Sequence, residues 1–156
     1  MSSTQGDLLV RTISKVGIAV ISDGRILLVR KKGGQHLILP GGKPEFGEDD
    51  LMALEREIDE ELGCLIERQS LHFCGCFTDR AAGLFDTMVA VRLYRGELCG
   101  DPTPCAEIEA IDWFPIDDHE NALLAPSLRN SILPSLARSA NFLSDETIEG
   151  GLERLH

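Results

Sequence analysis

Apolar residues in the first part of the chain recur with the spacing of β-strands. Residues 15–22 (KVGIAVIS) and 26–32 (ILLVRKK) form two aliphatic runs, and the Asp23-Gly24 pair between them is typical of a tight hairpin turn. We therefore predict a β-hairpin over this part of the chain. A shorter apolar run, 36–40 (HLILP), follows, and the chain must bend where it meets the glycines at 41 and 42.

Between residues 49 and 62 the apolar positions change to the period of a helix. At about 100° per residue they fall on one narrow side of the helical wheel, which predicts an amphipathic helix packed on a sheet. Gly63 is a typical helix stop. The predicted apolar stripe consists of Leu51, Leu54, Ile58, Leu62 and Leu65.

Strand-like runs return after this helix, and helical patterns close the chain. The order of elements predicts a mixed sheet with helices on both faces, an α/β fold. We expect an N-terminal extension at 1–14, a single domain at 15–140 and a polar tail at 141–156. The predicted elements are strands 71–77, 86–96 and 107–114, loops 78–84 and 100–105, and helices 116–126 and 127–143, the second bent or interrupted at Pro134.

Charge and cysteine content exclude several classes of function. A net charge of −11 argues against a nucleic-acid polymer as the main partner, because binding to its backbone depends on basic residues. The chain has no apolar run of the roughly 20 residues that a membrane helix needs, and it has no signal-peptide pattern, so we expect a cytoplasmic protein. The five cysteines lack CxxC spacing, which favours free thiols over a zinc site or disulfides.

Acidic residues crowd around the predicted helix. Ten lie in the 23 positions from Glu45 to Glu67, with one arginine among them. Glu57, Glu60 and Glu61 flank the apolar stripe, close enough to repel one another, and the last two oppose the helix macrodipole. A divalent cation such as Mg²⁺ or Mn²⁺, which takes oxygen ligands, would turn this repulsion into binding. The alternative is an ordinary solvated acidic face.

The acidic stretch resembles a known motif. From Gly42 it reads glycine, five residues, Glu48, seven residues and then REIDEELGC, which resembles the Nudix box of the Nudix hydrolases. Cys64 stands where that family usually has an aliphatic residue. The box spans residues 42–64, and the order of the surrounding elements extends the resemblance over about 15–125. It implies a Nudix α/β/α sandwich with a central mixed sheet, and metal-dependent hydrolysis of a nucleoside diphosphate linked to another group.

The resemblance also implies roles for individual residues. Glu57, Glu60 and Glu61 become the ligands of Mg²⁺ or Mn²⁺, in agreement with their position on the helical wheel. Arg56 is expected to orient a box glutamate through an ion pair. Glu48 is expected to be a structural partner or an outer metal contact, or only a carboxylate that favours the helix N-terminus.

Further candidates lie outside the acidic helix. Gly41 and Gly42 allow the backbone to approach metal and phosphate, and a carbonyl of Gly42 is a candidate ligand. Glu107 is the first candidate for an additional metal-binding acid, with Glu109 second; a solvated charge at a strand edge is the alternative. Trp113 is expected in the core. Candidate phosphate contacts, each equally well explained as a surface charge, are Lys43, Arg30 and Lys32.

The substrate is less clearly indicated than the reaction. Some Nudix subfamilies carry characteristic residues after the box, such as a proline or a tyrosine. Residues 78–83 (TDRAAG) hold neither of the two. This absence favours a nucleoside triphosphate pyrophosphohydrolase, with an ADP-sugar or related diphosphate as the alternative substrate. A non-catalytic nucleotide-sensing module is a second alternative, which the complete set of box glutamates disfavours. The end of the chain, 126–156, either packs on the domain or forms a homodimer.

Overall fold

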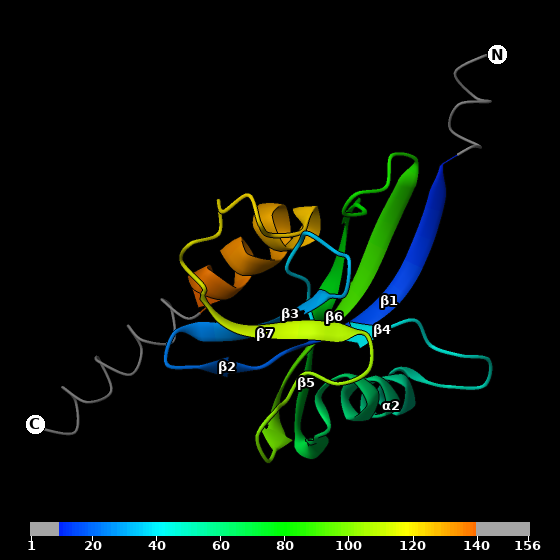
Figure 1. The fold of residues 1–156 in the computed structure, drawn as a ribbon, viewed down its shortest axis with the longest axis vertical. Helices are drawn as coiled ribbons and strands as arrows, with labels where there is room; N and C mark the ends of the chain where they lie inside the picture. The colour runs from blue at the N-terminus through cyan, green and yellow to red at the C-terminus, as the bar shows by residue number, and fades with distance from the viewer. Residues whose placement is uncertain (1–9, 140–156) are drawn as a thin grey trace, which may run out of the picture.

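The computed structural model describes residues 10–139, which form two sheets between helices (Figure 1). The first sheet has the order β4-β1-β6-β5, with strands β1 Arg11–Ala19, β4 Gly41–Gly42, β5 Leu65–Arg80 and β6 Thr87–Cys99. It is mixed, because β1 and β6 run parallel while the other pairs are antiparallel. The second, antiparallel sheet has the order β2-β3-β7, with β2 Ile21–Ser22, β3 Arg25–Lys31 and β7 Ile108–Pro115.

Helices cover both faces of the sheets, which confirms the predicted α/β architecture (Figure 1). Helix α2, Asp50–Leu62, lies on one side, and the helix at 126–139 lies on the other. The continuous apolar run of β3 reflects this double burial. Ile26 and Leu28 pack in the core under helix 126–139, whereas Leu27 and Val29 pack in the core under α2.

The predicted hairpin and helix are confirmed, with small changes at their ends. Asp23 and Gly24 both have positive φ, 52° and 73°, as a two-residue hairpin turn requires, but the first predicted strand is divided into β1 and β2. The side chain of Asp49 accepts a hydrogen bond from the Met52 N–H and caps α2, and Gly63 ends the helix with φ 64°. Leu65 is not on the apolar stripe, because it begins β5 and is 68% exposed.

The region 116–126 is not the helix that the sequence predicted, because it forms turns. Asn121 explains the difference. Its Nδ2 donates to Asp118 Oδ2 and its Oδ1 accepts the Leu123 N–H, and such local bonds compete with helical ones. Leu124 then pairs with Leu37 in an isolated parallel bridge.

Proline 134 does not interrupt the last helix. A π-helical turn, Leu128–Ile132, lies directly before it, and the Leu133 N–H donates to the Leu128 carbonyl. This wider turn lets the helix continue although Pro134 has no backbone N–H to donate. In the described range, no helix is long and apolar enough to cross a membrane.

Strand β5 is longer than predicted at both ends, so the expected loop at 78–84 is reduced to 81–86. Strand β1 begins at Arg11, inside the segment expected to precede the domain. Of the last predicted helix, residues 140–143 lie outside the described range, as does the predicted tail, 141–156.

Candidate active site

Helix α2 brings two of its glutamates against the short strand β4. The Gly41 N–H donates a hydrogen bond to Glu61 Oε1 at 3.1 Å. The Glu57 carboxylate lies against Gly42 so closely that a Cβ there would stand 2.6 Å from Glu57 Cδ. Gly42 therefore has to be glycine for Glu57 to occupy this position.

Gly41 is required by a second close approach. Its φ is 140°, and a Cβ at this position would stand 2.1 Å from the Val16 carbonyl oxygen. Strand β4 pairs with β1 at this point, with Val16 opposite Gly42. The two glycines thus let the edge of the sheet pass directly beside the carboxylates of α2.

Arg56 connects the loop before α2 to the glutamates of the helix. Its Nε and Nη2 donate to the two carboxylate oxygens of Glu48 at 2.7 and 2.8 Å, and its Nη1 donates to Glu57 Oε1 at 2.8 Å. Its Nη2 also donates to the Lys43 carbonyl. Hydrogen bonds from Arg56 lower the pKa of Glu48 to about 2, so this pair stays ionised at neutral pH. The guanidinium therefore fixes one oxygen of Glu57.

Glu61 is unusual among the carboxylates of residues 10–139 because it is buried and forms no ion pair there. Its residue surface is 7% exposed. Loss of hydration raises its pKa to about 7, the negative charge of Glu57 adds to this rise, and the hydrogen bond from Gly41 opposes it. The positive charges of Lys31 and Lys15 oppose the rise more weakly, so the carboxylate still favours a further cation beside it.

The remaining predicted residues make fewer contacts with this group. The Glu60 side chain is 58% exposed, and its one ion pair within residues 10–139 is with Arg56, at 3.9 Å. Glu107 is exposed, and its carbonyl accepts the Lys32 N–H. The Arg30 guanidinium pairs with Glu109 at 2.6 Å. The roles of these residues and of the exposed Lys43 remain predictions.

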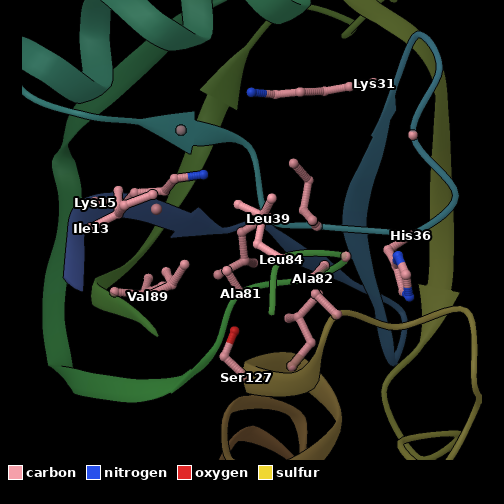
Figure 2. A pocket seen from close by; sticks show the side chains of 18 of the residues that line it. Ile13, Lys15, Lys31, His36, Leu39, Ala81, Ala82, Leu84, Val89 and Ser127 are labelled. Carbon is pink, nitrogen blue, oxygen red and sulfur yellow. The ribbon is translucent and has the colours of Figure 1, made fainter. Parts of the chain in front are cut away.

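A cleft of about 600 Å³ is lined in part by Gly41 and Gly42. Figure 2 shows other side chains of its lining, from Lys31 to Ser127. Its floor is formed by alternate residues of the paired strands β1 and β6, and its far end by the β5–β6 loop and the start of helix 126–139. Trp113 is absent from the lining and packs against the core, as predicted. The floor residues are Ile13, Lys15, Gly17, Val89 and Val91.

Two lysines that the sequence reasoning did not select line this cleft. Lys15 on β1 and Lys31 on β3 are both half-buried, and their side chains reach the end of the cleft away from Ser127 (Figure 2). Lys15 could have been selected from the sequence, because it is a charged residue in a predicted strand whose neighbouring positions are apolar. Lys31 is adjacent to Arg30 and Lys32, and its orientation depends on the alternation along β3.

Comparisons with known proteins decide the family. A family model described as the NUDIX domain matches residues 12–136. The chain belongs to the Nudix family. It is therefore a Nudix hydrolase, a class of enzyme that acts on phosphorus-containing anhydrides, and the acidic stretch at 42–64 is its Nudix box. No curated protein sequence matches the chain.

Solved Nudix structures share the fold. A MutT Nudix hydrolase from Burkholderia pseudomallei is 30% identical, with 69% of this chain and 85% of that chain covered and a TM-score of 0.59. A MutT protein from Methanosarcina mazei is 20% identical, with 84% and 96% covered and a TM-score of 0.67. An ADP-ribose pyrophosphatase from Streptococcus suis is 22% identical, with 80% and 86% covered and a TM-score of 0.50.

Nudix hydrolases generally use divalent metal ions, and the box of this chain fits one in donor chemistry. Within residues 10–139, no three His, Cys, Asp or Glu side chains are arranged to hold a metal. Two carboxylates, Glu57 and Glu61, do lie side by side against the glycines. Mg²⁺ is usually bound by one or two carboxylates together with substrate phosphates and waters. A ligand set completed by the substrate therefore suits this site.

Proposed function

We propose that this Nudix hydrolase is a nucleoside triphosphate pyrophosphohydrolase. It hydrolyses its substrate between the α- and β-phosphates and releases a nucleoside monophosphate and pyrophosphate. The observation that carries this proposal is the asymmetry of the cleft. Its half-buried charged groups, Lys15 and Lys31, stand at the box end, whereas the rest of the lining combines apolar side chains with the polar residues Gln35, His36 and Ser127 and the exposed Arg80. A nucleoside triphosphate has the same asymmetry, with all its charge at one end.

The alternative substrate, an ADP-sugar or related diphosphate, fits this asymmetry less well. Its diphosphate lies in the middle of the molecule, with polar sugars on both sides. The loop that closes the cleft contributes small side chains, Ala81, Ala82 and Gly83, and no tyrosine or proline.

In this proposal Glu57, Glu61 and the more exposed Glu60 hold Mg²⁺ or Mn²⁺, with the Gly42 carbonyl and Glu107 as further candidate ligands. The bound ion supplies charge neutralisation on the phosphate oxygens and a more acidic water. Arg56 keeps Glu57 in place through its 2.8 Å bond. Glu57 is the first candidate to accept the proton of the attacking water, whose oxygen ends on phosphorus as the bridging P–O bond breaks. Gly41, Gly42, Lys43 and Arg30 remain candidate contacts of the phosphates.

The proposal is tested by a hydrolysis panel with Mg²⁺ and with Mn²⁺. The panel holds common and oxidised nucleoside triphosphates, ADP-ribose, sugar nucleotides and dinucleoside polyphosphates, and Glu61→Gln serves as the inactive control. We expect a nucleoside triphosphate to give monophosphate and pyrophosphate with the highest kcat/KM, and EDTA to abolish turnover. Preferred turnover of ADP-ribose or a sugar nucleotide would select the alternative substrate. Nucleotide binding without turnover of any compound would favour the sensing module.

A further inference from the structure

Lys15 occupies an unusual position for a charged side chain. It lies on β1 opposite Val91 of β6, between Ile13 and Gly17, and these neighbours are apolar. It is the only charged residue in this floor of the cleft. A cation in an apolar floor loses hydration, and this loss has to be offset by an anion.

The described part of the protein supplies no direct partner for this cation. Among residues 10–139, neither Lys15 nor Lys31 forms an ion pair. Loss of hydration, the largest cause, and repulsion from Lys31 lower the pKa of Lys15, while the charges of Glu61 and Glu57 oppose this change. A cation bound to these glutamates would remove that remaining compensation.

We propose that Lys15 is a substrate-binding residue that, with Lys31, holds a phosphate of the substrate at the box end of the cleft. Lys15 and Lys31 approach this end from two different strands (Figure 2). A phosphate placed between them would separate two like charges and satisfy both. The proposal rests on the proposed function only in requiring a substrate with phosphates at this end, so a diphosphate substrate would use the same lysines.

This role differs from a purely structural one in what it predicts. If Lys15 only balanced the charges of Glu57 and Glu61, its removal would destabilise the metal-free protein and leave substrate binding unchanged. If Lys15 binds phosphate, its removal weakens binding of the phosphate chain. The stability of the folded protein should then stay the same or increase when an apolar side chain of similar length replaces Lys15, since the floor around it is apolar.

The test compares Lys15→Met with wild type, with Lys15→Arg as the charge-conserving variant and Arg11→Met as the matched control. Arg11 lies on the same strand as Lys15, but it is exposed and is not part of the cleft lining. Two quantities are measured: KM and kcat for the substrate that the panel selects, and the Kd of an α,β-methylene nucleoside triphosphate in EDTA by calorimetry. The melting temperature of each variant reports folding.

We expect Lys15→Met to raise KM and Kd by roughly tenfold to a hundredfold, the effect of losing one hydrogen bond to a charged group. The change in kcat should be smaller, Lys15→Arg should restore most of the affinity, and Arg11→Met should behave as wild type. An unchanged KM and Kd in a folded Lys15→Met variant would overturn the proposal.

The outcomes also separate this proposal from the proposed function. Turnover of nucleoside triphosphates with no effect of Lys15→Met refutes the role of Lys15 alone. Turnover of a sugar nucleotide, with KM raised by Lys15→Met, refutes the triphosphate assignment and supports the lysine. If Lys15→Met does not fold, Lys15→Gln gives the same comparison, because its amide keeps the polarity and loses the charge.

Discussion

The carboxylates of helix α2 differ between its two ends. In the first turn, Asp50 accepts three hydrogen bonds from the guanidinium of Arg92, which hold its pKa below the usual range. Near the last turn, Glu61 is buried with one backbone donor and a pKa raised to about 7. The same kind of side chain is therefore paired with an arginine where it supports the fold, and left without an ion pair within residues 10–139 where it lies against Gly41.

The positively charged side chains show the same contrast between paired and unpaired groups. Lys15 is half-buried and lacks an ion pair among the described residues, whereas Arg56 and Arg92 are held by several carboxylate contacts. At the box end, half-buried or buried groups of both signs therefore lack an ion pair among the described residues and only partly offset one another. An enzyme that binds a cation together with a polyanion needs this arrangement, because each ligand supplies the charge that the other lacks.

The largest effect is expected from Glu61→Gln. Loss of a charge at the metal position should lower kcat/KM by about three orders of magnitude, equivalent to about 4 kcal/mol. Asp59→Asn is the control, because this carboxylate lies on the same helix but is exposed. Initial rates at saturating Mg²⁺ measure both variants. Activity of Glu61→Gln within tenfold of wild type would show that the buried carboxylate is not part of the site.

The second prediction concerns stability and uses the same variant without metal. The pKa of Glu61 is about 7 in the folded protein against an ordinary value of 4.5, so ionisation is penalised by folding. Wild type should therefore lose stability as pH rises from about 4.5 to above 7, by an amount of the order of 2–4 kcal/mol. Glutamine does not ionise, so Glu61→Gln should not show this loss.

Urea unfolding in EDTA at pH 5 and pH 8 measures this difference. At pH 8 we expect Glu61→Gln to be more stable than wild type, and at pH 5 the two should be nearly equal. Addition of Mg²⁺ at pH 8 should then stabilise wild type more than the variant. Equal differences at both pH values would mean that the folded protein does not penalise the charge of Glu61.

Much of the box end could be predicted from the sequence, because its residues lie close together along the chain. Helical spacing placed Glu57 and Glu61 beside the apolar stripe, and the glycines at 41 and 42 indicated a close backbone approach. Their burial could not be predicted in the same way. It depends on β4 pairing with β1 at Val16, which is a contact between distant segments.

The cleft was less predictable for the same physical reason. Lys15 reaches it only because β1 pairs in parallel with β6, and the direction of Lys31 depends on the register of β3. Local signals also failed at 116–126, where apolar residues suggested a helix but the side chain of Asn121 bonds the backbone instead. Local patterns therefore identify single elements, while the shape of the binding cleft is set by pairing across the sheet.

The third prediction concerns Arg56, which connects Glu48 to Glu57. Arg56→Lys keeps the charge but cannot make the two parallel bonds to Glu48 and the third bond to Glu57. We expect kcat/KM to fall by about 10- to 100-fold, as for other residues that orient a metal ligand. The Mg²⁺ concentration for half-maximal activity should rise as well, and an unchanged value would argue against an orienting role.

The fourth prediction removes a partnered carboxylate. Asp50→Asn leaves Arg92 without its ionised acceptor, and we expect a loss of about 1–2 kcal/mol in the free energy of unfolding at pH 7. Because the folded protein lowers the pKa of Asp50, this contribution is present above the ordinary pKa of an aspartate and is lost as pH falls below it. Urea midpoints at pH 7 and pH 3 measure it, while kcat/KM should stay within about twofold of wild type.

The smallest effect is expected from Glu55→Gln. Glu55 pairs with Arg68 at 2.7 Å, but the Arg68 side chain is 61% exposed, so water screens the interaction. We expect less than about 0.5 kcal/mol of destabilisation at low salt and no change in kcat or KM. A clear loss of activity in this variant would break the comparison, because it would show that a carboxylate paired away from the box end also serves the reaction. An unchanged enzyme would instead agree with a catalytic role for the glutamates beside Gly41 and Gly42, including Glu57, which Arg56 holds in place.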